Sequence, residues 1–298
     1  MSARIDLHIH SRYSEDGDLP VADLFALAES RGLAAISITD HDSIESIPDA
    51  RACSGTSPVH YVPGAEITTV LPEDGSQQHI LGYFIDPASP DLQAILKTIQ
   101  EYRTAIAVKR MEALRAQGIF MDADRVWKMA DGRAPAATSI MREAIGAPEN
   151  AGLDFLETYR TGPKSDNPLM NFYRDYLVEG KPGYVNFESI PTARGIRAIL
   201  DAGGIPILAH PVFVKNRSLL DVIAGNGIMG IEAISSYHSP EEIEFFTAYA
   251  RSRRLLITAG SDFHGPTTKP KVAMGGVENN YLQLYLDLRE AHEAMRAK

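Results

Sequence analysis

The chain has 298 residues, of which 44% are hydrophobic and 23% are charged, and this composition excludes an intrinsically disordered protein. Its 29 basic and 39 acidic residues give a formal net charge of -10, which argues against long duplex nucleic acid as a partner because duplex binding needs a broad basic face. A single cysteine, Cys53, excludes an internal disulfide and a thiolate metal cluster, so any metal site must use histidine and carboxylate ligands.

The N-terminus runs directly into a strand pattern instead of an export signal. No apolar stretch approaches the roughly 20 residues that a membrane helix needs. We therefore expect a cytoplasmic protein that does not cross a membrane.

Strand and helix patterns alternate along most of the chain. Short β-branched or alternating runs predict strands at 4–8, 34–39, 60–67, 80–85, 205–209, 228–234 and 255–259. Amphipathic patterns predict helices at 21–31, 192–202 and 240–252. This alternation predicts an α/β fold with a mostly parallel sheet that is covered by helices.

The middle of the chain interrupts the alternation. Pro90 opens a long helix with one apolar face, which ends at Gly118. The segment 120–180 has the pattern of successive helices and no convincing strand. We interpret 119–180 as a helical insertion that caps a barrel formed by 1–118 and 181–298.

Histidines and carboxylates follow the predicted strands. His8 and His10 close the first strand, and alternation puts both imidazoles on one face, where they can reach one ion. The pair alone would fit a structural role equally well. Other strand ends carry similar residues, namely Asp40, His41 and Asp42, then Glu66, then His210, then Asp262 and His264. Because the carboxyl ends of parallel barrel strands share one rim, we expect these groups to converge there as a metal site.

His79 opens a predicted strand instead of closing one. A two-residue turn at Asp74 and Gly75 would place His79 opposite Val70, about 13 Å from Glu66 along an extended strand. Either the loop curls more than an ideal hairpin or His79 serves a different ion. We favour His79 as a ligand.

The order of these motifs resembles one family. The chain reads D-L-H-I-H, T-D-H-D, P-G-A-E, A-H-P and S-D-F-H between Asp6 and His264, and is similar to the polymerase and histidinol phosphatase (PHP) superfamily of metal-dependent phosphoesterases. The resemblance implies a distorted seven-stranded (β/α) barrel of PHP type with three divalent metal ions. It assigns His8, His10, Glu66 and Asp262 to the first ion, Glu66, His79 and His210 to the second, and Asp16, His41 and His264 to the third.

The third set contains a departure from the family pattern. Relatives read S-D-G where this chain reads Ser14, Glu15, Asp16 and Gly17. We prefer Asp16 because the following glycine keeps the turn, with Glu15 as the alternative. Imidazole and carboxylate ligands suit zinc, manganese or iron, with magnesium as an option at the third, more oxygen-rich site. Asp40 and Asp42 are expected to orient ligands.

Such a cluster suits phosphoryl chemistry, in which metal ions offset negative charge and a metal-bound water attacks. The chain lacks a G-x-S-x-G nucleophile elbow, which agrees with attack by water. His238 follows another strand and could protonate the leaving oxygen or serve a structural role.

Basic side chains are candidates for binding the substrate phosphate. Arg103 and Arg110 lie about two turns apart on the long helix, and we favour Arg103 over Arg110. Arg142 and Lys181 occupy positions where similar PHP proteins carry phosphate-binding residues.

The resemblance extends to a stand-alone subgroup that acts on nucleotides. It implies hydrolysis of the 3'-phosphate of nucleoside 3',5'-bisphosphates, or of short RNA ends, in a small nucleotide substrate. Three alternatives stay open: a histidinol phosphate phosphatase, an amidohydrolase, and a non-catalytic nucleotide-binding module. Side-by-side turnover of these substrates distinguishes them.

Overall fold

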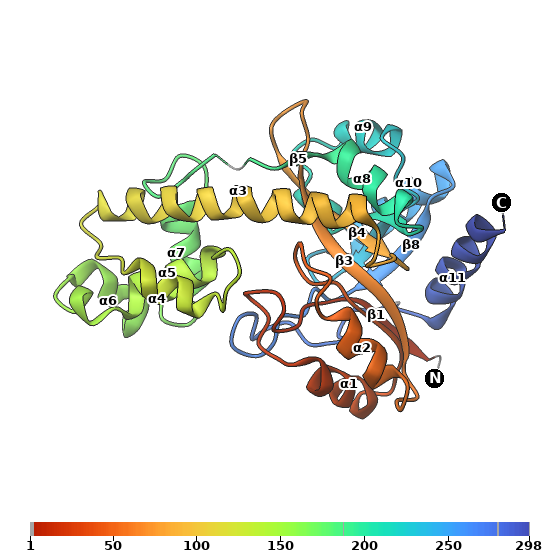
Figure 1. The fold of residues 1–298 in the computed structure, drawn as a ribbon, viewed down its shortest axis with the longest axis horizontal. Helices are drawn as coiled ribbons and strands as arrows, with labels where there is room; N and C mark the ends of the chain where they lie inside the picture. The colour runs from red at the N-terminus through yellow and green to blue at the C-terminus, as the bar shows by residue number, and fades with distance from the viewer. Residues whose placement is uncertain (1–2, 187, 279, 298) are drawn as a thin grey trace. The chain divides into compact units, whose positions relative to one another are not determined.

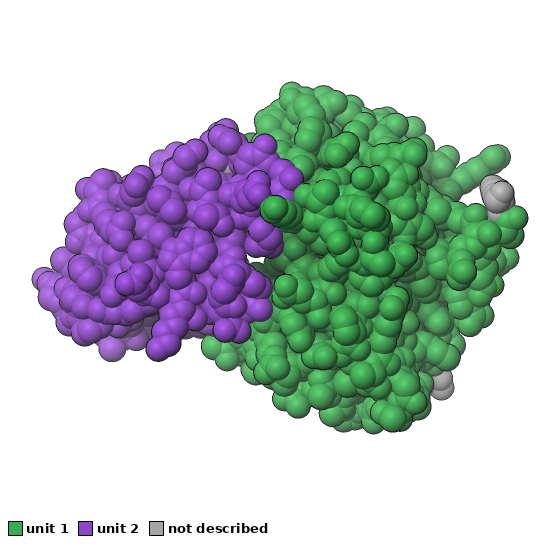
Figure 2. Space-filling view, in the orientation of Figure 1, with its two compact units in different colours: residues 1–97, 189–298 green, residues 98–188 purple. Residues whose placement is uncertain are grey.

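The computed structural model describes residues 3–186, 188–278 and 280–297. The chain forms two compact units, which are coloured separately in Figure 2. Unit 1 comprises Met1–Lys97 and Ser189–Lys298, and unit 2 comprises Thr98–Glu188. The division at residues 118 and 181, with the insertion as a cap, stays a prediction. No helix within the described residues is long and apolar enough to span a membrane.

Unit 1 is built on a strongly curved sheet (Figure 1). Its main path runs β1-β2-β3-β4-β6-β7-β8, and β5 pairs with β3 outside this path. The strands are β1 (Arg4–Ile9), β2 (Leu33–Ile38), β3 (His60–Val70), β4 (Gln77–Tyr83), β5 (Ile190–Pro191), β6 (Ile205–Leu208), β7 (Gly230–Ser235) and β8 (Leu256–Gly260).

A bridge between Ile9 and Phe263 joins β1 to the segment after β8 and nearly closes the sheet into a barrel. Along the main path, neighbouring strands are parallel except for β4, which runs antiparallel to β3 and β6. The predicted seven-stranded barrel is therefore confirmed, with one reversed strand. Reversal brings the start of β4, and not its end, to the rim where the parallel strands finish.

Helices cover the outside of unit 1. They are α1 (Val21–Ser30), α2 (Ile47–Ser54), α8 (Thr192–Asp201), α9 (Leu219–Gly225), α10 (Pro240–Arg253) and α11 (Leu282–Arg296). α10 begins with a capping box in which the Ser239 side chain accepts from Glu242 N and the Glu242 carboxylate accepts from Ser239 N. This start fixes where β7 ends and α10 begins. α10 packs against β7, so it supports the strand from behind.

The described residues of unit 2 form helices joined by turns and no strand, as the sequence pattern predicts. α3 (Pro90–Arg115) starts in unit 1 and continues into unit 2. It is followed by α4 (Ala123–Met129), α5 (Ala137–Gly146), the short turn η1 (Pro148–Asn150), α6 (Asp154–Arg160), α7 (Pro168–Phe172) and η2 (Tyr173–Leu177). Leu114, Val126, Ile140, Leu156 and Phe172 are buried in one apolar cluster, so unit 2 has its own core.

Candidate metal centre

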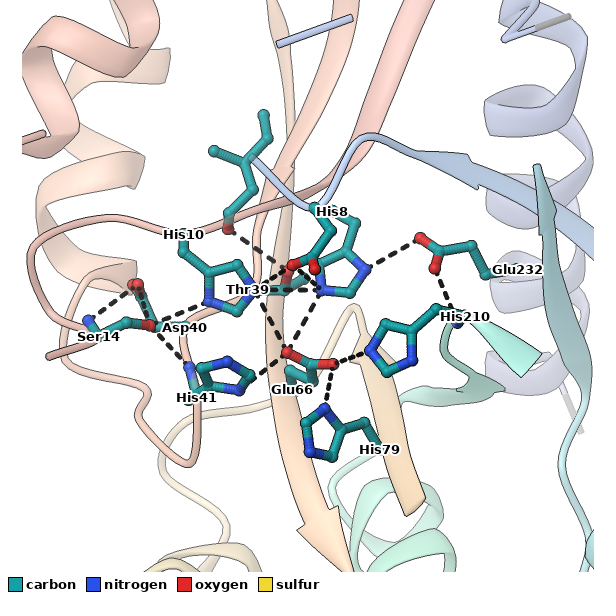
Figure 3. A network of polar contacts seen from close by, with 12 residues as sticks. His8, His10, Ser14, Thr39, Asp40, His41, Glu66, His79, His210 and Glu232 are labelled. Carbon is teal, nitrogen blue, oxygen red and sulfur yellow. Dashed lines mark hydrogen bonds and ion pairs between the residues drawn. The ribbon is translucent and has the colours of Figure 1, made fainter. Parts of the chain in front are cut away.

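The structure brings the nine predicted ligands into contact at one end of the barrel (Figure 3 shows six of them). Three overlapping groups can each hold an ion by the spacing of their donor atoms. The groups are His8, His10, Glu66 and Asp262; His41, Glu66 and His79; and His10, Asp16, His41 and His264. Parallel strand ends therefore converge as their order along the chain predicts.

The first group is buried, and its four donor atoms lie close together. The Nε2 atoms of His8 and His10 lie 3.1 Å apart, and each lies 3.3 Å from Glu66 Oε2. Asp262 Oδ1 lies 3.3 Å from His8 Nε2 and 3.1 Å from His10 Nε2. Zinc ligands at about 2.0–2.1 Å would stand about 3.3 Å apart in a tetrahedron. These four atoms are therefore spaced for a small divalent ion.

Hydrogen bonds aim both imidazoles at the same point. His8 Nδ1 lies 2.9 Å from Glu232 Oε1, a carboxylate oxygen that can only accept. His10 Nδ1 lies 3.0 Å from Ser14 Oγ, whose own proton goes to Asp40. Both Nδ1 atoms therefore act as donors, and both Nε2 lone pairs are available as ligands. We assign these tautomers from the partners.

Two carboxylate oxygens of this group lack other partners. Glu66 Oε2 and Asp262 Oδ1 are buried and form no hydrogen bond within the described residues. Such a buried, unpartnered oxygen is costly unless a cation meets it. Asp16 Oδ1 in the third group is also buried and forms no hydrogen bond within the described residues. The residues present thus fit divalent metal ions.

The electrostatics of the first group favour positive charge. Burial lowers the pKa of His8, but the charges of Glu232, Glu66 and Asp262 raise the pKa well above its ordinary value. Burial also lowers the pKa of His10, but hydrogen bonds to Asp262 and Glu66 outweigh it and raise the pKa to about 9. A field that holds protons on these rings also favours a metal dication in their place.

Glu66 connects the first group with the second. Its Oε2 lies 2.9 Å from His41 Nδ1, and its Oε1 lies 2.8 Å from His79 Nδ1. His210 Nε2 contacts the same Oε1 at 3.0 Å. Burial raises the pKa of Glu66, but the surrounding imidazoles lower it well below its ordinary range, so the carboxylate is ionised. One carboxylate can therefore serve two neighbouring ions.

The β3–β4 hairpin corrects the expected register of His79. Leu71 N donates to Ser76 O, so the loop comprises 72–75 and not two residues. Gln77 pairs with Val70, and His79 pairs with Thr68. Alternation then puts His79 on the same face as Glu66. The loop thus curls more than an ideal two-residue hairpin, which is one of the two possibilities left open by the sequence, and His79 contacts Glu66.

The third group combines one carboxylate with three imidazoles. Asp16 Oδ2 lies 3.5 Å from His264 Nε2 and 3.7 Å from His41 Nε2. His264 Nδ1 donates to Asp262 O at 2.9 Å, which leaves Nε2 to bind a metal. Burial and the charges of His10 and Lys269 lower the pKa of His264 to about 4, so the ring is neutral near pH 7. Asp16 lies with the imidazoles of this group, and its choice over Glu15 as the ligand stays a prediction.

Three buried aspartates hold the loops that present the ligands. Asp40 accepts from the backbone and hydroxyl groups of Ser11 and Ser14. Asp42 accepts from Thr68 N and Oγ1, both at 2.7 Å, and ties the loop of His41 to β3. Asp6 accepts from Ser261 and from Gly275 N, which fixes the turn before Asp262. The site is therefore preorganised by carboxylates behind it.

Three of the six non-glycine residues that have positive φ angles within the described residues lie at this rim. Asp42, His210 and Asp262 have positive φ angles of 49°, 26° and 54°. Left-handed backbone at residues other than glycine is costly and persists where the surroundings enforce it. Asp42 is held by the Thr68 bonds, and His210 N donates to Glu232 Oε2 at 2.9 Å. Two of these strained residues, His210 and Asp262, are predicted ligands, and the third, Asp42, positions the loop that carries His41.

The sequence patterns did not identify three further residues of the site. Glu232 lies within the apolar run of β7 and contacts both His8 and His210. Tyr237 donates to Asp262 Oδ2 at 2.5 Å, and Lys269 Nζ lies 2.5 Å from the same oxygen. A charged residue inside a buried strand was the available signal for Glu232. Tyr237 and Lys269 carry no local pattern that marks them.

The remaining predicted residues lie elsewhere. His238 donates through Nδ1 to Ala233 O and packs against the Phe246 ring at 4.9 Å, which are structural contacts. Its catalytic role stays a prediction. Arg103 and Arg142 lie on α3 and α5, and Lys181 follows η2, all in unit 2. Their binding of substrate phosphate also stays a prediction.

Comparisons with known proteins agree on a family and on related activities. The PHP domain model matches residues 6–116. The chain is 31% identical to the 3',5'-nucleoside bisphosphate phosphatase of Chromobacterium violaceum, over 89% of this chain and 88% of that protein. It is 30% identical to the 5'-3' exoribonuclease of Haemophilus influenzae, over 89% of this chain and 92% of that protein.

A solved structure has the same fold over nearly its whole length. It is described as an amidohydrolase from Chromobacterium violaceum with bound sulfate and no metal, and it is 29% identical in sequence. It superposes with a TM-score of 0.81 and covers 97% of each chain. The barrel and the helical segment therefore recur together.

Proposed function

Because the chain belongs to the PHP domain family of metal-dependent phosphoesterases, we propose that it hydrolyses phosphate esters of nucleotides. The preferred reaction is removal of the 3'-phosphate from nucleoside 3',5'-bisphosphates, with trimming of short RNA ends as a related activity. The relatives' names supply this substrate class. The observation that carries the chemistry is the convergence of imidazoles and carboxylates on Glu66.

We infer three divalent ions at the three sets of ligands. His8, His10, Glu66 and Asp262 would hold the first; His79 and His210, sharing Glu66, would hold the second; and Asp16, His41 and His264 would hold the third. Bound there, the ions would supply positive charge for phosphoryl oxygens and acidify a water for attack. Zinc, manganese and iron suit these donors, whereas the single carboxylate of the third set does not favour magnesium, which prefers oxygen ligands.

Residues of the chain itself prepare the site for an anionic ester. Lys269 and Tyr237 bind Asp262 Oδ2, so Oδ1 is the oxygen that would hold the first ion. The Lys269 side chain is 18% exposed, and its ammonium group pairs with Asp262 Oδ2 beside the ligands. A second cation near the ligands would attract the substrate phosphate and would screen its charge from the carboxylates.

An exposed aromatic ring beside the cluster favours a nucleotide. Phe213 is 56% exposed, and its ring packs edge-on against His210 at 5.2 Å and Tyr237 at 4.9 Å. Those contacts fix the ring while one side stays open. An open aromatic face next to a phosphate-binding centre suits the stacking of a base. Histidinol phosphate carries a smaller ring, so it remains the second candidate.

Phosphate release from matched substrates tests the proposal. We expect protein loaded with manganese or zinc to release phosphate from adenosine 3',5'-bisphosphate much faster than from histidinol phosphate. Adenosine 5'-monophosphate serves as the matched nucleotide without a 3'-phosphate. Release from histidinol phosphate alone would replace the proposed substrate class, and tight nucleotide binding without any release would favour a non-catalytic module. Hydrolysis of amides without phosphate release would favour an amidohydrolase.

A further inference from the structure

Asp18 joins two chain segments that carry ligands of the third set. Asp16 lies two residues before Asp18 in the loop after β1, and His264 lies in the segment after β8. Asp18 N donates to His264 O at 2.8 Å. The Asp18 carboxylate accepts from Thr267 N at 2.6 Å and from Thr268 N and Oγ1, both at 3.0 Å. One residue therefore binds together two segments that are far apart in the sequence.

Gly265 allows these two segments to approach each other closely. A Cβ added at Gly265 would lie 2.5 Å from Asp18 Cβ and 2.6 Å from Asp18 Oδ2. The φ angle of Gly265 is 104°, which residues with a side chain rarely adopt. Lys269 N donates to Gly265 O at 3.1 Å, which closes a turn that contains both threonine donors. The contact between Asp18 and this turn therefore requires a glycine at position 265.

The start of the loop after β1 has a separate anchor. Asp40 accepts from the backbone and hydroxyl groups of Ser11 and Ser14. Asp18 holds the other end of the loop through its bonds to the segment after β8. Asp16 lies between these two anchors, so Asp40 and Asp18 together fix the backbone that carries it.

The position of the Asp16 carboxylate depends on these backbone anchors. Asp16 Oδ1 forms no hydrogen bond within the described residues. Oδ2 lies 3.5 Å from His264 Nε2 and 3.7 Å from His41 Nε2, which is longer than an ordinary hydrogen bond. Metal ligands must be held within roughly 0.5 Å of the geometry that binds the ion. The backbone of the loop therefore has to supply this precision.

We infer that Asp18 is a positioning residue of the third set, which holds Asp16 and His264 at the separation that binds one ion. This inference rests on the proposed metal centre. It assigns to Asp18 a role through the backbone of two ligands and not as a ligand.

Loss of Asp18 should act on the third ion and not on the first, because ligands of the first ion have other anchors. His8 and Glu66 lie within strands β1 and β3. Asp6 holds the turn before Asp262 by accepting from the residue that precedes it. A selective effect on one ion therefore distinguishes positioning by Asp18 from general support of the rim.

Manganese titration of the metal-free, full-length protein, with chelator competition to give the affinity of each ion, tests this role. Asp16→Asn removes the carboxylate of the third set and identifies the third ion by its loss. We expect Asp18→Ala to weaken the same ion about tenfold or more, as the loss of an outer partner does. The first and second ions should keep the parent's affinity.

Asp18→Asn is the conservative variant. Its carbonyl oxygen can accept from both threonine amides while its NH₂ donates to Thr268 Oγ1, so it should regain most of the affinity that Asp18→Ala loses. Gly265→Ala perturbs the same contact from the other segment and should weaken the third ion as Asp18→Ala does. Gly32→Ala is its matched control, because Gly32 also has a positive φ, of 65°, but an added Cβ meets nothing within 4 Å.

Unchanged affinity for all ions in Asp18→Ala would overturn the inference. Equal weakening of all three ions in both Asp18→Ala and Gly265→Ala would overturn it as well, because the contact would then support the whole rim. An intact first ion beside a weakened third ion supports it and shows that the variant is folded. If Asp16→Asn bound as many ions as the parent, the proposed third set itself would be contradicted, and Asp18 would have no ion to position. Failure of the positioning role and failure of the metal centre therefore give different results.

Discussion

The Glu66 carboxylate contacts five imidazoles, three through Oε2 and two through Oε1. The lone pairs of these ring nitrogens repel one another unless a cation or a proton lies between them, and the nearby carboxylates stabilise that positive charge. Asp262 supplies the second carboxylate of the first group, and Lys269 and Tyr237 hold its other oxygen. The charge of Asp262 is therefore central to cation binding.

Asp262→Asn should abolish most activity while keeping the side chain's shape. The amide removes a negative charge from the first group, so we expect one bound ion fewer and a kcat at least about 100-fold lower, beyond the roughly 10–100-fold effect of losing an outer partner. Metal analysis and phosphate release measure both effects. The exposed carboxylate of Asp287 on α11 provides the control, Asp287→Asn. Parent-like metal content and turnover in Asp262→Asn would contradict the assignment.

Glu232→Gln should weaken metal binding without removing a ligand. Both carboxylate oxygens accept hydrogen bonds, from His8 Nδ1 and from His210 N, and an amide offers only one acceptor. We expect about 10–100-fold weaker metal affinity, with activity regained at high metal concentration. Competition with a chelator gives the affinity. Glu244→Gln, on the exposed side of α10, should behave like the parent, and failure of excess metal to restore Glu232→Gln would argue for a direct role.

Phe213→Ala should weaken the binding of substrates that carry a base and should leave the binding of the phosphate groups unchanged. Stacking on an aromatic side chain contributes about 1–3 kcal/mol per base, so we expect KM for adenosine 3',5'-bisphosphate to rise about tenfold or more. KM for ribose 3,5-bisphosphate, which lacks the base, should stay unchanged. Phe213→Tyr is the conservative variant and should keep both values. Equal rises for the two substrates would show that Phe213 shapes the site without touching a base.

Ligands and their supports differ in how far the sequence reveals them. His8, His10 and Asp262 were predictable because strand ends of a parallel barrel meet at one rim. Glu232 contacts His8 from a position far along the chain, and its neighbours in β7 are apolar residues without a motif. The tertiary fold, and not a local sequence pattern, brings Glu232 into contact with His8. Lys269 lies in a loop, and its contact with Asp262 likewise depends on the tertiary fold and not on a local pattern.

The close approach of β8 to β1 is the element on which the first group depends. A Cβ added at Gly260 would lie 2.2 Å from His8 Cβ and 2.5 Å from Glu232 Oε1. Gly260→Ala should therefore displace both side chains and reduce metal content and turnover together. Gly225→Ala, at the end of α9 where an added Cβ meets nothing within 4 Å, is the control. Full metal content in Gly260→Ala would mean that the two strands can separate without cost.

The β3–β4 hairpin illustrates what an element's sequence can and cannot specify. Asp74 and Gly75 indicate a turn, but Pro72 has no N–H and cannot continue an antiparallel ladder, so pairing stops at Leu71 and Ser76. The register consequently moves by two residues on β4. Because side chains alternate with a period of two, His79 still lies on the face of Glu66. The sequence therefore predicted the sheet face on which His79 lies, but not the residue with which it pairs.

At the scale of the whole molecule, the two units have separate apolar cores. The cluster around Leu114, Ile140 and Phe172 belongs to unit 2, whereas Leu7, Val62 and Ile207 belong to a cluster of the barrel. Separate cores allow the units to unfold in separate steps. The ligands of the metal centre all belong to unit 1, so binding there stabilises unit 1 directly.

Metal addition should therefore raise the unfolding temperature of unit 1 more than that of unit 2. An ion at 100 times its Kd adds about 2.7 kcal/mol to the folded state, which corresponds to roughly 5–10 °C for a domain of this size. Trp127, the single tryptophan, lies in unit 2, so its fluorescence follows that unit while circular dichroism follows both. We expect zinc or manganese to shift the dichroism transition and to leave the tryptophan transition within about 2 °C. Asp262→Asn should lose most of the shift. Equal shifts of both signals in the parent would show that the units unfold as one cooperative body, because stabilisation at the barrel would then reach α4.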